Sequence, residues 1–199
     1  MSLAKQAKIL SKAQQDAVLA FLASTRYPVR DRVIFLLSVR AGLRAKEIAA
    51  LKWEMLTDAE GELTDVIALT NEAAKGRRGG RAIPIAKDLK AALITLKIEA
   101  ASDYRNSPYV VTSERGLNTS SYAVVNKFAG WYRALGFTGT SSHSGRRTAI
   151  TNWARRISTV GGSLRDVQIL AGHSALSTTQ RYTEADVDAM RRVVEAAYC

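Results

Sequence analysis

Residues 141–150 read Ser-Ser-His-Ser-Gly-Arg-Arg-Thr-Ala-Ile and include one of only two histidines in the 199-residue chain. In a helix that begins here, His143 and Arg146 are three positions apart and share a face, which Ile150 and Trp153 continue as an apolar stripe. A serine at 141 or 142 would cap the helix, so that its free N–H groups face the same space as the guanidinium. Because arginine binds two phosphate oxygens at once and imidazole exchanges its proton near neutral pH, the stretch predicts an anion site.

An H-x-x-R pair alone is weak evidence, since short motifs match by chance, and taken by itself the pair is better explained as a solvated helix start. The composition adds weight to the anion site. Twenty-nine Lys and Arg stand against 18 Asp and Glu, which gives a net charge of +11 and makes a polyanion, nucleic acid above all, the natural partner. The 47% hydrophobic content is ordinary for a globular chain with a core.

Other partners and cofactors find little support. The sequence has no run of 18 apolar residues, no secretory signal and no lipidation motif, so we expect a cytoplasmic protein, nucleoid-associated and of bacterial or phage type, with no membrane partner. Cys199 is the lone cysteine and the last residue, which excludes an internal disulfide and a cysteine-based metal site. The histidines are 30 residues apart and the carboxylates are scattered, which argues against a metal-dependent nuclease. We expect no cofactor.

The pattern of apolar residues predicts a fold that is mainly α with one small antiparallel β-sheet (α+β). Ser11 and Gln14 read as a capping box that opens a helix to about residue 25, and residues 33–39, apolar nearly all round, predict a buried helix that stops at Gly42. Alternating apolar residues predict two strands within residues 63–69 and 82–85. Further helices are expected over 45–53, 88–101, 118 or 120 to 135, 143–158, 163–170, 176–182 and 186–198. We expect residues 1–199 to form a single domain.

The link between the two predicted strands is rich in glycine and strongly basic. It carries Lys75, Arg77, Arg78 and Arg81. Such a turn is either a solvated hairpin tip or a finger that lies against DNA phosphates. These three arginines, with Arg147 beside Arg146, are our candidate DNA-binding residues.

Two apolar stripes have more than one interpretation. Tyr122, Val125, Phe128 and Trp131 lie on one predicted helix, and we assign them to the core rather than to base stacking. In the last predicted helix, Val187, Met190 and Val194 share a stripe that would pack on the chain's own core or dock on a neighbouring protomer.

The order of motifs resembles that of the tyrosine recombinases, the phage integrase family. Gly42-Leu-Arg44-Ala-Lys-Glu47 resembles the first-arginine motif, and Lys75-Gly followed by Ile83-Pro-Ile85 resembles the β-hairpin lysine. His143-Ser-Gly-Arg146 resembles the H-x-x-R box, Ala171-Gly-His173 the L-G-H box, and Thr179-Gln-Arg-Tyr182 the nucleophile motif. The resemblance covers essentially the whole chain and implies the family's catalytic-domain fold.

The resemblance also implies a mechanism on double-stranded DNA. Arg44 and Arg146 would hold the two non-bridging oxygens of a phosphate that Tyr182 attacks. His143 and His173 would add hydrogen bonds, His143 being the better candidate to help remove the tyrosine proton, and Lys75 would protonate the departing 5′ oxygen. The product would be a 3′-phosphotyrosyl linkage, resealed without metal or ATP. Four protomers on paired sites, a homotetramer, would exchange strands.

Three departures from the family pattern stand out. Ser144-Gly145 replaces the usual Asp-Leu of the H-D-L-R box, Ala171 stands where leucine is common, and arginines crowd Lys75. Only 43 residues precede Arg44, so we expect the N-terminal core-binding domain of larger members to be absent or truncated. The alternatives are a non-catalytic DNA-binding protein on the same scaffold and a type IB topoisomerase-like enzyme.

Overall fold

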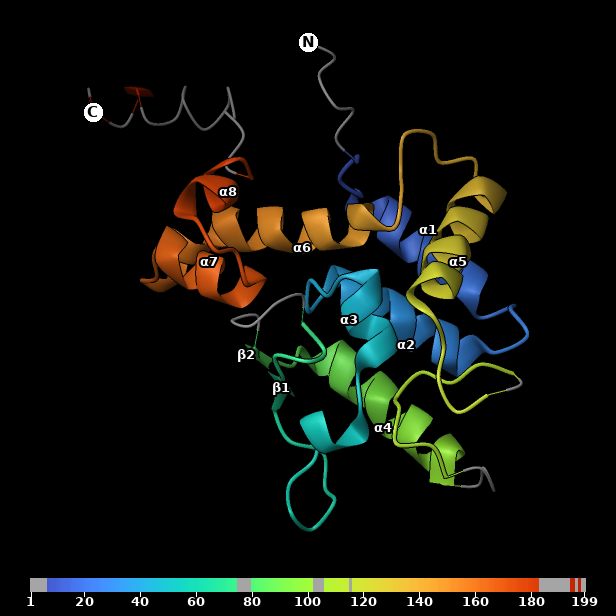
Figure 1. Ribbon diagram of the computed structural model, residues 1–199. Coiled ribbons are helices and arrows are strands. Elements are labelled where there is room, and N and C mark those ends of the chain that lie inside the picture. The colour runs from blue at the N-terminus through green and yellow to red at the C-terminus, as the bar shows by residue number, and fades with distance from the viewer. Residues whose placement is uncertain are drawn as a thin grey trace. The chain divides into compact units, whose positions relative to one another are not determined.

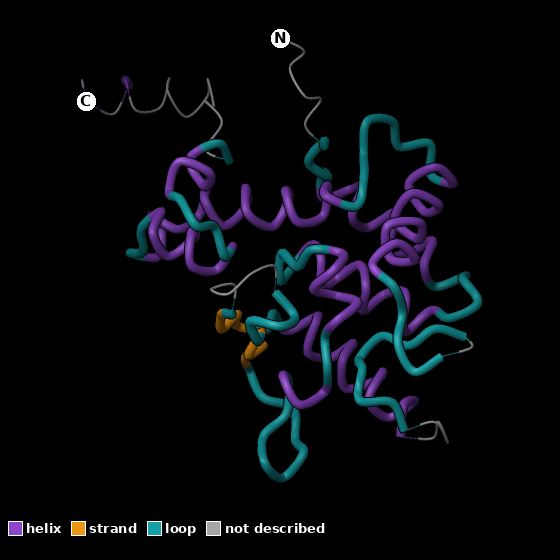
Figure 2. Tube along the Cα trace, viewed as in Figure 1, coloured by secondary structure: helices purple, strands orange, loops and turns teal. Residues whose placement is uncertain are grey.

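The computed structural model describes residues 7–74, 80–101, 106–114, 116–182, 194–195 and 197 (Figure 1). The helices and strands run in the order α1 Lys12–Leu22, α2 Pro28–Val39, α3 Ala45–Ala50, the 3₁₀ turn Trp53–Met55, β1 Val66–Leu69, β2 Arg81–Pro84, α4 Lys87–Ala101, α5 Ser121–Ala134, α6 His143–Arg156, the 3₁₀ turn Ile157–Val160, α7 Leu164–Ala171 and α8 Leu176–Gln180. Figure 2 shows how small the share of strand is, and the predicted fold class is confirmed.

The chain forms two compact units, residues 1–149 and 150–199, and the boundary falls within α6. The expectation that residues 1–199 form a single catalytic domain stays a prediction. In the larger unit the core is built around α2, against which α1, α3 and α4 pack. The smaller unit has its own core of Ile150, Val167 and Ala171, with Trp153 and Tyr182 packed against it. Among the described residues no helix is long and apolar enough to cross a membrane.

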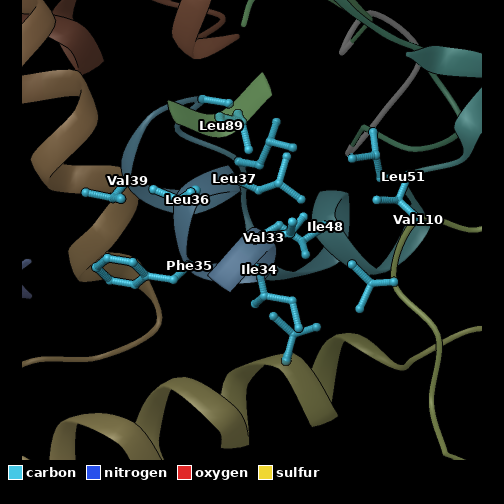
Figure 3. Close-up of a cluster of buried hydrophobic side chains, with 14 of the residues drawn as sticks. Val33, Ile34, Phe35, Leu36, Leu37, Val39, Ile48, Leu51, Leu89 and Val110 are labelled. Atoms are coloured by element: carbon cyan, nitrogen blue, oxygen red, sulfur yellow. The ribbon is translucent and has the colours of Figure 1, made fainter. Parts of the chain in front are cut away.

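Helix α2 is central because nearly every side of it is apolar. Val33, Ile34, Phe35, Leu36 and Leu37 are all fully buried, and Figure 3 shows their side chains pointing in different directions from the one helix, together with Ile48, Leu51, Leu89 and Val110. A helix that is hydrophobic all round is stable only when other elements surround it. The sequence prediction of a buried helix here is confirmed.

The end of α2 sets the direction of the chain toward the first candidate arginine. Gly42 has a φ of 63°, in the left-handed region that glycine adopts without a Cβ penalty. The N–H of Leu43 then reaches back to the carbonyl of Leu37 at 3.0 Å. This glycine stop was predicted, and it places Arg44 at the first corner after the buried helix.

The sheet is a two-stranded antiparallel hairpin. Its register pairs Ile67 with Ile83 and Leu69 with Arg81. Ile67, Leu69 and Ile83 face the core, while alternate residues face outward, as the period of two in a strand requires. The turn residues 75–79 lie outside the described residues.

Two sequence predictions are wrong, each for a reason that a local pattern does not contain. The predicted helix over residues 45–53 ends at Ala50, because Leu51 is extended and the N–H of Trp53 bonds to the carbonyl of Pro108 at 2.9 Å. Phe128 and Trp131 are buried as predicted. Tyr122 and Val125, assigned to the same core stripe, are 73% and 36% exposed. The face of α5 that packs on the core carries Val124 in their place.

The hydroxyl of Tyr132 is buried and has no hydrogen-bond partner among the described residues. Burial accordingly raises the pKa of this phenol. Since an unsatisfied buried hydroxyl costs about 1–3 kcal/mol, Tyr132→Phe should leave the free energy of unfolding unchanged or raise it by up to ~1 kcal/mol. Denaturant unfolding measures this, and a clear loss of stability would mean that the hydroxyl bonds to another group.

Candidate active site

Arg44 is the N-cap residue of α3, and Glu47 at the third helical position holds it in place. The carboxylate accepts a hydrogen bond from the backbone N–H of Arg44 and another from its Nη1, both at 2.8 Å. The Arg44 side chain remains 31% exposed, whereas that of Glu47 is only 1% exposed. A buried anion therefore orients a cation that still reaches the surface.

A second arginine shares the same carboxylate. Nη1 of Arg81 donates to Oε1 of Glu47 at 3.0 Å and Nη2 to Oε2 at 3.1 Å, a two-pronged contact between the start of β2 and α3. Burial alone would raise the pKa of Glu47, but the hydrogen bonds and charges of Arg81 and Arg44 outweigh it and the pKa is lowered. The carboxylate is ionised throughout the neutral range.

The position of Arg81 corrects its sequence interpretation. We expected an exposed residue of a cationic turn that contacts DNA phosphates. Its side chain is 3% exposed, and its positive charge pairs with the buried carboxylate of Glu47. The error arose because Arg81 was counted with the turn, whereas it is the first residue of β2.

His143 and Arg146 occupy the first turn of α6, as predicted. The hydroxyl of Ser141 accepts the backbone N–H of His143 at 3.3 Å, so the proposed capping role falls to Ser141. The His143 side chain is exposed. Arg146 is 5% exposed, and its Nη1 donates to the carbonyl of Gly42 at 2.5 Å. Arg146, the second candidate arginine, is thus bonded to the backbone of Gly42, which lies two residues before Arg44 between α2 and α3.

The start of α6 is held by hydrogen bonds of the Ser144 and Thr148 side chains. Ser144 is fully buried, and its hydroxyl accepts the N–H of Ser141 at 3.0 Å. The hydroxyl of Thr148 donates to the carbonyl of Ser144 and accepts the N–H of Leu10. Arg147, predicted to bind DNA, donates to the carbonyl of Ala7 at 3.0 Å. Residues 7–10 are therefore tied to this helix.

Gly145 allows α6 to approach α2 closely. A Cβ at this position would lie 2.4 Å from Oγ and 3.0 Å from Cβ of Ser38. That hydroxyl is itself buried without a hydrogen-bond partner among the described residues. The glycine is therefore required by packing rather than by backbone conformation.

We expect Gly145→Ala to destabilise the protein by about 1–3 kcal/mol, the usual cost of overpacking. The cost should fall in a Ser38→Ala background, because that change removes the nearest atom. Gly130→Ala is the matched control: this glycine lies in α5, and its added Cβ would meet nothing within 4 Å. The control should gain up to ~1 kcal/mol from helix propensity. Equal effects of the two alanines in thermal unfolding would contradict the close-packing interpretation.

The smaller unit holds the remaining described candidates, His173 and Tyr182. Nδ1 of His173 lies 3.0 Å from Oγ1 of the buried Thr179. The backbone carbonyl of His173 accepts a hydrogen bond from Nε2 of Gln168 at 2.9 Å. Gly172, at a φ of 61°, makes the turn that ends α7 before the histidine. The rings of His173 and Tyr182 stack with centroids 5.5 Å apart and an interplanar angle of 24°.

The contacts of Tyr182 fix its position but leave it accessible. Its N–H bonds to the carbonyl of Thr179 at 2.9 Å, directly after α8, and its ring packs on the core of the smaller unit. The residue is only half-buried. The contacts that hold Tyr182 are thus made by its ring and its backbone.

Several predicted residues are outside the described part of the chain: Lys75, Arg77, Arg78, Val187 and Met190. Sequence reasoning also missed functional partners. Glu47 was quoted only as part of the first-arginine motif, although an acidic residue three positions after a helix start is a capping signal. Nothing in the sequence pointed to Gln168 and Thr179 as partners of His173.

Comparison with known proteins identifies the family. Residues 8–188 match the phage integrase family. Tyrosine recombinase XerA of Pyrococcus horikoshii is 30% identical over 198 residues, which cover 96% of this chain and 62% of XerA.

Solved structures support the fold. A crystal structure of XerA recombinase superimposes with a TM-score of 0.74 at 22% identity, covering 95% of this chain and 64% of that one. The pre-cleavage complex of the XerH site-specific recombinase bound to its difH substrate gives 0.70 at 20% identity, covering 99% and 55%. The chain spans less than two thirds of the length of each of these relatives. Since the family match extends over α1 to α8, the chain belongs to the phage integrase family of tyrosine recombinases.

Proposed function

We propose that the chain is the strand-cleaving part of a site-specific DNA recombinase that works through a 3′-phosphotyrosyl intermediate. The observation that carries the proposal is the bond from Arg146 to the carbonyl of Gly42, which places the second arginine of the family motifs beside the corner that presents Arg44. Two guanidinium groups at one corner suit the two non-bridging oxygens of a phosphodiester.

The chemistry follows from the weakness of the nucleophile. A phenol with a pKa near ~10 attacks phosphorus only when the negative charge of the phosphate is neutralised. Arg44 and Arg146 supply that charge, and their effect is greatest in the five-coordinate transition state, where negative charge on the non-bridging oxygens increases. The oxygen of Tyr182 forms a bond to phosphorus, and the bond from phosphorus to the 5′ oxygen breaks. One phosphodiester thus replaces another, so that the DNA can be resealed without an external energy source.

Two protons must move in this step. His143, exposed at the start of α6, helps to take the proton from Tyr182. Lys75 gives a proton to the departing 5′ oxygen, a task for which arginine is too weak an acid. His173 hydrogen-bonds the phosphate through Nε2, while Thr179 holds its Nδ1. These are protein groups throughout, so neither a metal ion nor ATP has a role in the proposal.

The reverse attack, by the 5′ hydroxyl of another strand, reseals the DNA in a new arrangement. Two duplexes require four such reactions, and we propose that a homotetramer on paired sites carries them out. The net charge of +11 supports double-stranded DNA as the partner. Arg77, Arg78 and Arg147 are proposed phosphate contacts, and an active protein works where the genome is, in the cytoplasm of a bacterium or of a phage-infected cell.

Covalent trapping tests the proposal. The chain is incubated with nicked fragments of its source genome and denatured in detergent, and DNA-linked peptides are identified by mass spectrometry. We expect a phosphotyrosyl peptide containing Tyr182, unaffected by EDTA, with one sequence enriched in the attached DNA.

Other outcomes identify the rivals. Tight, salt-sensitive DNA binding without any adduct would indicate a non-catalytic DNA-binding protein. An adduct spread evenly over unrelated sequences would indicate a type IB topoisomerase-like strand transferase.

A further inference from the structure

Three charged side chains, Arg44, Glu47 and Arg81, form a linked ion-pair cluster at the start of α3. Arg81 and Glu47 are 34 residues apart in sequence and are 3% and 1% exposed as side chains, so that contact is almost completely removed from water. Arg44, at 31% exposure, is the only member of the three that reaches solvent substantially. The cluster is therefore built from the interior outward.

Arg44 and Arg81 contact Glu47 in different ways. Glu47 uses both oxygens for both partners: Oε1 accepts Nη1 of Arg44 and Nη1 of Arg81, and Oε2 accepts the backbone N–H of Arg44 and Nη2 of Arg81. A carboxylate gripped from one side by a planar fork cannot rotate freely, because rotation breaks both bonds of the fork. Its orientation then fixes where the side chain of Arg44 can bond.

We propose that Arg81 is a positioning residue of the DNA-cleavage reaction, which acts by locking Glu47 so that Arg44 meets a non-bridging oxygen of the scissile phosphate. The proposal rests on the proposed function. It gives Arg81 a role other than DNA contact: through Glu47, Arg81 fixes the orientation of the Arg44 side chain. Charge balance points the same way, since one carboxylate between two guanidinium groups leaves the cluster a net cation, and that surplus faces the surface at Arg44.

The test compares two DNA substrates that carry the target site found by trapping. One has an ordinary scissile phosphodiester. The other is a methylphosphonate, in which a methyl group replaces one non-bridging oxygen and the reacting group is uncharged. A cation that neutralises phosphate charge contributes much less on the uncharged substrate, so a defect transmitted through Arg44 shrinks there, whereas a loss of folded protein lowers both rates equally.

Rates of adduct formation are measured for Arg81→Met, with Arg44→Met as the positive control. Arg30→Met is the matched control, because Arg30 is also a buried, ion-paired arginine, with 10% of its side chain exposed and Asp31 as its partner. For Arg81→Met we expect a loss of about a hundredfold on the phosphodiester, the scale of a misplaced catalytic group, and of less than about tenfold on the methylphosphonate. Arg30→Met should change the two rates by the same factor.

Two further variants separate transmission through Glu47 from other causes. If Arg81 acts through Glu47, the double variant Glu47→Gln with Arg81→Met should lose no more activity than Glu47→Gln alone. Arg81→Lys keeps a cation in place but lacks the fork. It should lose less than Arg81→Met and show the same ratio between substrates, which guards against poor folding of the methionine variant.

The wild-type rate on the phosphodiester reports on the proposed function by itself, and its absence would overturn both that function and the role built on it. With an active wild type, equal losses on both substrates for Arg81→Met and Arg81→Lys would overturn the positioning role alone. Independent, multiplying losses for Glu47→Gln and Arg81→Met would do the same.

Discussion

Replacing Tyr182 by phenylalanine should abolish the covalent DNA adduct without disturbing the fold. The ring makes the structural contacts of this residue: it packs on the core of the smaller unit and stacks on His173 at 5.5 Å. Phenylalanine keeps the ring and loses only the oxygen that the proposed reaction needs. Removal of a nucleophile lowers turnover by up to ~10⁶-fold, which is below detection in a trapping assay.

The measurement is the fraction of DNA that migrates with protein after detergent denaturation. Tyr109→Phe is the control, since Tyr109 is also half-buried but belongs to none of the predicted motifs and forms a bridge with Lys52. The control should retain the adduct, and the Tyr182 variant should still bind DNA and melt like the wild type. An adduct that persists in Tyr182→Phe would assign the nucleophile to another side chain.

Glu47→Gln should cost about 3–5 kcal/mol of folding free energy, because it leaves the buried Arg81 without its counter-ion. Glutamine has nearly the same shape, so the loss reports on charge rather than on packing. Urea unfolding at neutral pH measures it. Glu54→Gln is the control: Glu54 pairs with Lys52 but is 68% exposed, and its loss should hardly change the unfolding midpoint.

The paired Glu47 carboxylate also predicts how the stability of the protein changes with pH. Since the folded state lowers the pKa of Glu47, the carboxylate contributes fully above its ordinary pKa of ~4.3, and its contribution is lost as the pH falls through the lowered value. Wild type should therefore lose stability in acid more steeply than Glu47→Gln. Parallel curves for the two proteins below pH ~4 would contradict an ionised, paired Glu47.

Sequence predicted best what local chemistry determines. Ser11 and Ser163 were predicted helix starts, Ser120 was one of two predicted alternatives, and each of the three precedes a helix by one residue. The buried helix at 33–39 followed from its lack of a polar face, and α2 has that character. Such features depend on residues within one or two turns of each other, where spacing and propensity carry the information.

The predictions failed where a partner is distant along the chain. The bond from Trp53 to Pro108 ended α3 early, and the partner of Arg81 is 34 residues away. For the candidate site, motif order predicts Arg44, Arg146, His173 and Tyr182 as site residues, and these roles stay predictions; it does not predict the side chains that contact them. Supporting contacts depend on which elements pack together, and this is decided by the tertiary fold rather than by any short pattern.

The contact between Gly145 and Ser38 constrains how this protein can be engineered or can drift in sequence. The familiar H-D-L-R box has a leucine where Gly145 stands, and here the first carbon of any side chain already meets α2. Consensus design, which replaces unusual residues by common ones, should fail at this position unless Ser38 changes too. Residues 38 and 145 thus form an epistatic pair: a substitution at Ser38 in α2 must come before leucine can replace Gly145.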